Sequence, residues 1–195
     1  MEIYYHKTFP DDPWLTKSAN KILRSYLKKT DIGLELGSGR STIWFAKRTK
    51  HLTSVEHNEV WYRKVSQAIK KSELQNIDYH LIHSDLSDEK GENTAYVRLI
   101  NRFNDNIFDY VLIDGIYRDF CTLNVLGKIR PGGVLIIDNV NWFLPSESCS
   151  PCSRTYKLGA KGEIWDRINI TISDWRTIWT SSGVTDTALF IKPCN

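Results

Sequence analysis

A carboxylate and a pair of glycines stand together where an apolar segment leads into a helix. Residues 34–42 read LELGSGRST, so Glu35 precedes Gly37, Ser38 and Gly39. Glycine lets the backbone adopt positive φ and lets a ligand come close to the backbone N–H groups. A carboxylate beside such a turn would repel a pyrophosphate, whereas it would attract an ammonium group or accept from a hydroxyl. The pattern therefore predicts a bound nucleoside that carries a cationic group.

Further carboxylates follow four other apolar segments, each where a strand is expected to end: Glu56, Asp85, Asp114 and Asp138. Glu56 comes about twenty residues after the glycines, where nucleotide-binding domains place an acid on the ribose hydroxyls. Asp85 would accept a hydrogen bond from an adenine amino group. Each of these two acids could instead cap the helix that follows it. We favour ligand binding for both, because parallel strands end at the edge of the sheet where ligands bind.

Asp114, Asp138 and Asn139 are the candidates for chemistry on a second substrate. The two carboxylates could orient an acceptor or take its proton. With Asn139 they present three oxygen ligands, which could hold Mg²⁺ against a diol. The alternative is that Asp114 and Asp138 are hydrogen-bonded groups that line a cleft. We favour this alternative, so no metal ligand is assigned and Mg²⁺ stays an open option.

Two basic side chains lie close to these acids in the sequence. His57 follows Glu56 and is expected near the ribose or the adenine of the ligand. Arg118 could bind an anionic group of a substrate through its planar guanidinium. It could equally form an ordinary ion pair with Asp119 or Asp114. The sequence leaves both roles of Arg118 open.

The segment 141–170 is rich in serine and proline and predicts a lid or substrate loop. Its aromatic residues include Trp142, Phe143 and Trp165. These rings could stack on an acceptor or anchor the loop. Cys149 and Cys152 have the spacing of half a zinc site, but no second pair with that spacing follows. We therefore expect a plain loop or a disulfide there.

Short apolar strands alternate with helices through most of the chain. Strands are predicted at 32–36, 51–56, 77–83, 110–113 and 134–137, and helices at 14–29, 42–50, 59–72, 94–103 and 118–129. This alternation predicts an α/β fold with a doubly wound, mostly parallel sheet and helices on both faces. After a short helix near 162–167, two strands at 175–179 and 187–191 would add an antiparallel pair, giving seven strands.

The length of 195 residues predicts a single domain. Within it we expect a leading helix region at 1–30, a ligand-binding core at 31–140, the lid or substrate loop at 141–170 and a C-terminal strand pair at 171–195.

Composition excludes several classes of protein. The chain has 26 basic and 23 acidic residues in short, dispersed clusters and a net charge of +3, so a nucleic-acid partner is not favoured. No apolar run is long enough to span a bilayer, and the first residues lack the apolar core of a signal peptide. We therefore expect a cytoplasmic protein without a membrane partner, and the oligomeric state stays open.

As a set, the motifs between residues 32 and 139 resemble those of the class I S-adenosylmethionine-dependent methyltransferases, a Rossmann-like family. The matching residues are Glu35 to Gly39, Glu56, Asp85, Phe108 to Gly115, Arg130 to Leu135, and Asp138-Asn139. The resemblance covers more than half of the chain. Its motifs are specific for the cofactor and say little about the substrate.

The resemblance assigns a strand end to each part of S-adenosylmethionine. It implies that the turn of Gly37, Ser38 and Gly39 lines the methionine part and that Glu35 faces its ammonium group. The later strand ends would hold the nucleoside. The residues implied there are Glu56 at the ribose hydroxyls, and Ser84 and Asp85 at the adenine.

For the methyl acceptor the sequence favours a small molecule, and oxygen over nitrogen. This preference rests on the carboxylate-rich cleft and on the absence of the Asn/Asp-Pro-Pro-aromatic motif of enzymes that methylate amino groups on nucleic acids. The catechol O-methyltransferase group, which uses Mg²⁺, carries a lysine where this chain has Tyr117. Asp114 and Asp138 are the expected catalytic residues.

Two other functions stay open. An NAD-dependent oxidoreductase would also begin with a strand, a glycine turn and a helix, but its fingerprint has a third glycine, whereas Gly39 is followed by Arg40, Ser41 and Thr42. Glu35 also disfavours a pyrophosphate. A protein that binds S-adenosylmethionine without catalysing transfer would keep every cofactor motif.

Overall fold

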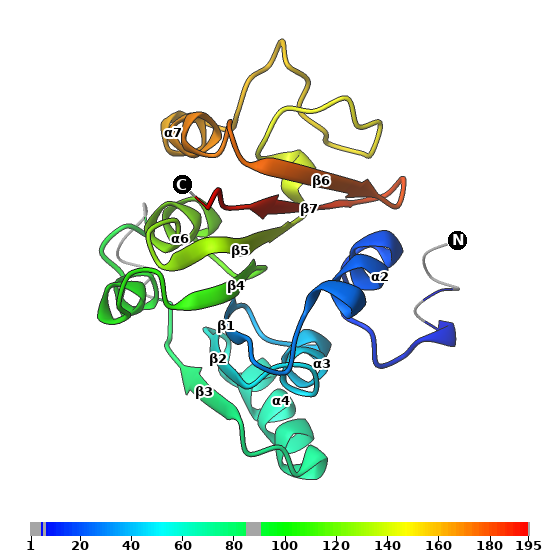
Figure 1. The fold of residues 1–195 in the computed structure, drawn as a ribbon, viewed down its shortest axis with the longest axis vertical. Helices are drawn as coiled ribbons and strands as arrows, with labels where there is room; N and C mark the ends of the chain where they lie inside the picture. The colour runs from blue at the N-terminus through cyan, green and yellow to red at the C-terminus, as the bar shows by residue number, and fades with distance from the viewer. Residues whose placement is uncertain (1–4, 6, 85–90, 195) are drawn as a thin grey trace.

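Seven strands form one mixed sheet in the computed structural model, which describes residues 5, 7–84 and 91–194 (Figure 1). The strands are β1 (Ile32–Leu36), β2 (His51–Glu56), β3 (Ile77–Leu81), β4 (Phe108–Ile113), β5 (Ile129–Asp138), β6 (Arg176–Ser181) and β7 (Asp186–Ile191). Their order is β3-β2-β1-β4-β5-β7-β6. The first five are parallel, and β7 pairs antiparallel with both β5 and β6. The predicted α/β fold with a doubly wound sheet is therefore confirmed.

Helices cover both faces of this sheet (Figure 1). They are α2 (Lys17–Tyr26), α3 (Arg40–Ala46), α4 (Glu59–Ser72), α5 (Ala95–Arg98), α6 (Arg118–Val125) and α7 (Glu163–Thr171), with 3-10 turns η1 (Leu99–Arg102) and η2 (Val140–Trp142). The helices α2 and α3 share one apolar cluster with the sheet, and α5, α6 and α7 share the other. Polar side chains begin several helices: Thr16, Asn58 and Thr94 accept from the backbone N–H three residues later.

Alternation along the central strands separates the two clusters. In β4, Leu112 packs toward α2 and α3, whereas Val111 and Ile113 belong to the opposite cluster. On the α3 face, Gly33 makes room for Tyr110, because a Cβ at Gly33 would come within 1.9 Å of that ring. Glu35 is two residues further along β1 and so projects to the same face.

The predicted elements exist, but their ends differ. The helix predicted at 94–103 is α5 followed by the tighter turn η1, and the helix predicted at 118–129 ends at Val125. The strand predicted at 134–137 begins earlier, at Ile129, so residues 131–133 lie within β5, where the register against β4 shifts between Phe108 and Tyr110. Gly132 has φ +77° there, and its N–H donates to the carbonyl of Lys192 beyond β7. The glycines therefore bend the strand without ending its pairing.

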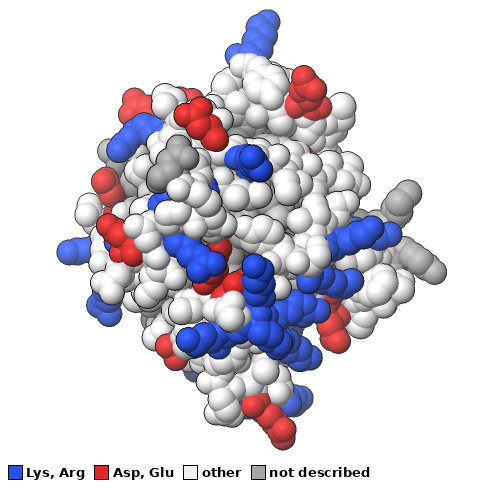
Figure 2. Space-filling view, in the orientation of Figure 1, with Lys and Arg blue, Asp and Glu red and all other residues white. Residues whose placement is uncertain are grey.

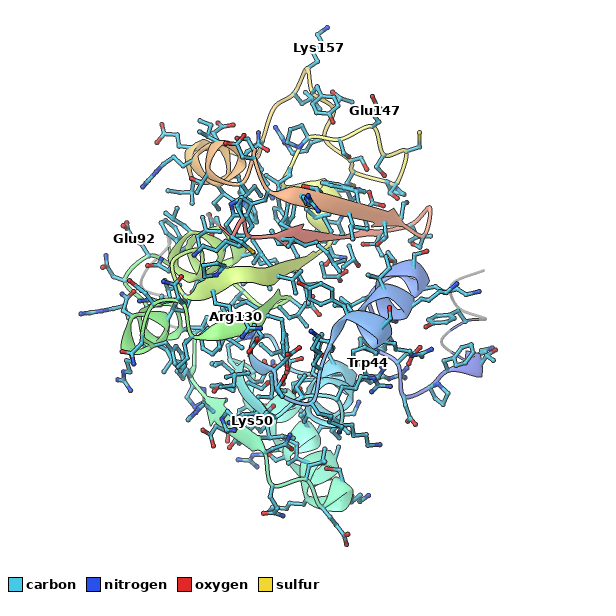
Figure 3. All side chains as sticks on the ribbon, viewed as in Figure 1. Trp44, Lys50, Glu92, Arg130, Glu147 and Lys157 are labelled. Carbon is cyan, nitrogen blue, oxygen red and sulfur yellow. The ribbon has the colours of Figure 1, made fainter. Side chains whose placement is uncertain are left out.

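No helix in the described ranges is long and apolar enough to cross a membrane. Lys and Arg side chains gather in the lower centre of one face in Figure 2, close to where Figure 3 labels Arg130 and Lys50. Arg130 is the second residue of β5 and Lys50 precedes β2, so both lie at the amino ends of these strands. These two residues therefore lie away from the strand ends that carry the candidate site.

Candidate active site

The glycine turn after β1 packs directly against the end of β4. Gly37 has φ +99°, and a Cβ there would lie 2.4 Å from the backbone nitrogen of Gly115 and 2.6 Å from the carbonyl carbon of Asp114. The amide of Asp114 donates to the carbonyl of Leu36 (2.9 Å). Gly37 is thus needed both for its backbone conformation and for the close approach of two strand ends. The sequence pointed to Gly37 but gave Gly115 no role.

Gly39 differs from Gly37 both in its backbone conformation and in the space around it. Its φ of 176° is an extended conformation open to any residue, and a Cβ at Gly39 would meet only the hydroxyl of Ser41, at 3.8 Å. Nothing within the described chain therefore requires a glycine at this position. The space above Gly39 is room that a ligand can use.

Glu35 lies buried beneath the turn. Its Oε2 accepts from the hydroxyls of Thr42 (2.6 Å) and Ser54 (2.5 Å), while Oε1 has no hydrogen-bond partner within the described residues. Burial raises the pKa of Glu35 to about 7, although the hydroxyl donors oppose that shift. Because Glu35 is 0% exposed, its charge when ionised would stabilise a cationic group of a ligand across the turn rather than by direct contact.

The pKa of Glu56, at the end of β2, is shifted in the opposite direction from that of Glu35. Oε2 accepts from the backbone and the hydroxyl of Ser38 (3.1 and 2.8 Å), and Oε1 accepts from the backbone amides of His57 and Asn58 (2.9 Å each). Nδ1 of His57 lies 3.1 Å from Oε1. Burial alone would raise the pKa of Glu56, but these donors together lower it to about 2. Glu56 is therefore an ionised acceptor next to the glycine turn.

Aromatic side chains hold Ser38 in place beside Glu56. The indole Nε1 of Trp61 donates to the carbonyl of Ser38 (2.7 Å), and the Ser38 hydroxyl lies 2.7 Å from the hydroxyl of Tyr79. His57 packs edge-on against Tyr96. The sequence does not single out Trp61 and Tyr79, because nothing in their local pattern distinguishes them from core aromatics.

The adenine side is described in part. The amide of Ile82 donates to the carbonyl of Glu56 (2.8 Å), which keeps the chain after β3 next to the end of β2. Ser84 follows there and is half-buried. The predicted adenine residue Asp85 lies outside the described residues. The adenine assignments therefore stay predictions.

Arg118 joins the ends of β4 and β5 through its whole guanidinium group. Nε donates to the carbonyl of Gly115 (3.0 Å), and Nη2 donates to the carbonyl and the carboxylate of Asp114 (3.0 and 2.8 Å). Nη1 donates to the carbonyl of Asp138 (2.5 Å) and to Oδ1 of Asn139 (3.0 Å). Arginine has five N–H donors, so each has an acceptor within the protein. Of the two roles left open for Arg118, the structure shows the ion pair with Asp114.

The two acids that Arg118 brings together differ in accessibility. The side chain of Asp114 is 33% exposed, whereas Asp138 is 4% exposed and accepts from the hydroxyl of Thr187 (2.7 Å). Burial raises the pKa of Asp114, and Arg118 opposes that shift. Burial and the nearby Asp114 raise the pKa of Asp138 to about 7. The pair thus holds protons more tightly than ordinary carboxylates.

These residues do not fit a divalent metal. One carboxylate oxygen of Asp114 and the side-chain oxygen of Asn139 accept from the Arg118 guanidinium, and Asp138 Oδ1 accepts from Thr187. A second cation would have to displace a guanidinium that already neutralises the site. Within the described parts of the chain, no group of three or more His, Cys, Asp or Glu side chains could hold a metal ion.

The segment 141–170 lies next to this cluster and is tied to the sheet. Asn141 donates to the carbonyl of Pro151 (3.0 Å), and Ser150 donates to the buried Asp186 of β7 (2.6 Å). The described cysteines, Cys149 and Cys152 included, are free thiols. The disulfide alternative is therefore wrong. The rings of Phe143 and Trp165 stack at 4.8 Å, with Trp165 2% exposed, while Trp142 is 43% exposed.

The central part of the chain matches a known protein family. Residues 34–140, more than half of the chain, match the sequence profile of a family described as a methyltransferase domain. A search of curated proteins finds no match.

Solved structures share the fold at low sequence identity. A Staphylococcus aureus protein provisionally named caffeoyl-CoA O-methyltransferase has a TM-score of 0.60 at 16% identity, over 98% of this chain and 92% of its own. A methyltransferase-like protein from Silicibacter pomeroyi has a TM-score of 0.60 at 19% identity, over 93% and 89%. The M. jannaschii protein TYW2, solved in complex with AdoMet, has a TM-score of 0.53 at 13% identity, over 92% and 77%.

The sheet is Rossmann-like, with acids at neighbouring strand ends. The chain belongs to the methyltransferase-domain family and is a class I S-adenosylmethionine-dependent methyltransferase.

Proposed function

We propose that the protein transfers a methyl group from S-adenosylmethionine to a small-molecule acceptor, at oxygen. The observation that carries the proposal is the contrast between the two glycines of the turn. Gly37 is required by the fold, whereas Gly39 has room for a Cβ that no described residue fills. Open space beside an ionised Glu56 and above a buried, unpartnered oxygen of Glu35 suits a ligand with hydroxyls and an ammonium group.

The proposed cofactor contacts follow from the position of each side chain. Gly37, Ser38 and Gly39 would line the methionine part, with Glu35 beneath its ammonium group. Glu56 would exchange its bond to the Ser38 hydroxyl for bonds to the ribose hydroxyls. The nucleoside would extend over a further group of residues, namely His57, Ser84 and Asp85.

In S-adenosylmethionine the methyl group is bound to a sulfonium sulfur. When the methyl group is transferred, the rest of the cofactor is released as a neutral thioether. The acceptor oxygen forms the new bond to the methyl carbon while the carbon–sulfur bond breaks and its electron pair stays on sulfur. The protein must then hold the acceptor in line and receive its proton. Asp114 is the accessible carboxylate for this step, and burial, which raises its pKa, would strengthen it as a base. Asp138, whose pKa is raised by burial and by Asp114, would lie beside it.

Cofactor binding is the first test of the proposal. Isothermal titration with S-adenosylhomocysteine should give saturable binding, and Glu56→Ala should weaken it at least about tenfold, because the ribose hydroxyls lose a charged acceptor. Saturable NADH binding without a response to S-adenosylhomocysteine would favour the oxidoreductase alternative.

Turnover is tested with an acceptor screen that follows labelled methyl groups, run with Mg²⁺ and with EDTA. We expect Asp114→Asn to abolish transfer while leaving S-adenosylhomocysteine affinity within about threefold. Cofactor binding with no methylation across the screen would favour the non-catalytic alternative. The cytoplasmic location and the division of the chain at residues 30, 140 and 170 stay predictions.

A further inference from the structure

A cleft of about 730 Å³ opens beside the glycine turn. It is lined by the segment 8–14, by α3 with the two residues after it, and by α4. Ser38, Gly39 and Asp114 also belong to its lining, so the cleft is continuous with the candidate active site. Its volume is in the range of pockets that bind small molecules, roughly 300–1,000 Å³.

The charges of this cleft are unbalanced. Its basic residues are Arg40, Lys47, Arg48 and Lys64. None of these four takes part in an ion pair in the described part of the chain. Of the acids in the lining, Asp12 is paired with Arg24 and Asp114 with Arg118, which leaves Asp11 as the third. Positive charge therefore exceeds negative charge within a concave wall, where the field is concentrated.

Three of these cations lie over tryptophan rings. The pairs are Arg40 over Trp14 (5.1 Å), Arg48 over Trp44 (3.9 Å) and Lys64 over Trp61 (4.4 Å). Trp44, labelled in Figure 3, also donates to Asp12 and so joins α3 to the segment before α2. Trp61 is fixed to the carbonyl of Ser38 at the glycine turn. The cleft thus offers flat apolar surface and cationic groups side by side.

The methyl donor does not account for these cations. S-adenosylmethionine carries a sulfonium and an ammonium group against one carboxylate, so its net charge is positive. An excess of unpaired lysine and arginine side chains would repel such a molecule. The charge of the cleft instead suits the other substrate.

We propose that this cleft binds the methyl acceptor, and that the acceptor is a small molecule with a planar ring and a phosphate-type anionic group. The proposal rests on the methyltransferase function above and names the substrate class of that site. The ring would stack against Trp14, which is 60% exposed, and the anion would be held by Arg40 and Lys64. A small molecule is favoured over a long nucleic acid, because the cations line a concave pocket of about 730 Å³.

Inorganic pyrophosphate is the probe for the anion site, read by tryptophan fluorescence of the full chain at low salt. Saturable binding is expected, and the double variant R40Q/K64Q should weaken it at least about tenfold. The charge-conserving variant R40K/K64R should bind as the wild type does. Lys70→Gln is the matched control, because Lys70 is exposed on α4 and does not line the cleft.

S-adenosylhomocysteine affinity, measured on the same variants, separates this proposal from the proposed function. It should change less than about threefold in R40Q/K64Q. A large loss would assign the cations to the donor carboxylate and overturn the proposal. Pyrophosphate binding that the double variant leaves unchanged would also overturn it, whereas no S-adenosylhomocysteine binding by the wild type would refute the methyltransferase function itself.

The acceptor class is tested with pairs of ring compounds that differ by one phosphate group. We expect the phosphorylated member to be methylated with the lower KM, and R40Q/K64Q to raise that KM at least about tenfold with kcat within about threefold. Equal or better methylation of the unphosphorylated members would overturn the proposal. So would a single-stranded RNA that outcompetes pyrophosphate and is itself methylated.

Discussion

At the scale of single residues, substitutions at the two glycines of the turn should affect different properties: stability at Gly37 and cofactor binding at Gly39. Gly37→Ala should lower stability by about 2 kcal/mol or more, because the residue has φ +99° and its Cβ would collide with Gly115. Gly39→Ala should change stability by less than about 0.5 kcal/mol yet weaken S-adenosylhomocysteine at least about tenfold. Thermal unfolding and isothermal titration of both variants provide the measurement. Unchanged cofactor affinity in Gly39→Ala would show that the space above it is not used.

Glu35 is a second prediction at this scale. Its pKa is about 7 in the fold against 4.5 in the unfolded chain, so the unfolded state releases its proton first as pH rises. Its contribution to stability is therefore complete below pH 4.5 and is lost as pH rises through 7. Glu35→Gln should remove that loss and be more stable than the wild type at pH 8, by up to about 3 kcal/mol. Urea unfolding at pH 5 and pH 8 is the test, and equal slopes with pH for both proteins would contradict it.

Between elements, Arg118 takes the place that a metal would need between β4 and β5. Arg118→Ala should destabilise the fold by roughly 2 kcal/mol or more, since Asp114 and the carbonyls at both strand ends lose their donors. Arg118→Lys should recover only part of this, because an ammonium cannot reach five acceptors in one plane. Chemical unfolding measures the stability of both variants.

The metal dependence of the wild type is a separate prediction. Its rate of methyl transfer should be equal in EDTA and in Mg²⁺, and a strict requirement for Mg²⁺ would contradict the conclusion that these residues do not hold a metal.

Across the whole molecule, Asp186 ties the segment 141–170 to the sheet. It accepts from Ser150 (2.6 Å) and from the indole of Trp179 (2.8 Å). Burial alone would raise the pKa of Asp186, but its hydroxyl and indole donors lower it overall. This stabilisation is present above the ordinary pKa of 3.8 and is lost as pH falls below it. Asp186→Ala should make the segment more sensitive to limited proteolysis at pH 7, and an unchanged cleavage rate would show that other contacts hold it.

The sequence by itself determined the sheet, the order of its elements and the glycine turn. Apolar strands alternating with amphipathic helices bury both faces of a parallel sheet, and this pattern is local in the chain. The acids Glu56, Asp114 and Asp138 were found in the same way, because each follows or ends an apolar run, and Glu35 lies one residue before the end of another. Termini of elements such as β5 were missed, since a bulge keeps its pairing through contacts with distant strands.

Only the tertiary structure decided what these residues do to one another. Arg118 lies twenty residues before Asp138 in the chain, yet the parallel pairing of β4 and β5 brings both to one edge, where the guanidinium satisfies two strand ends. The segment before α2 meets α3 and α4 in the same way and creates the basic, tryptophan-lined cleft. Distances of this kind depend on how helices pack across the sheet, and no local pattern of residues encodes them.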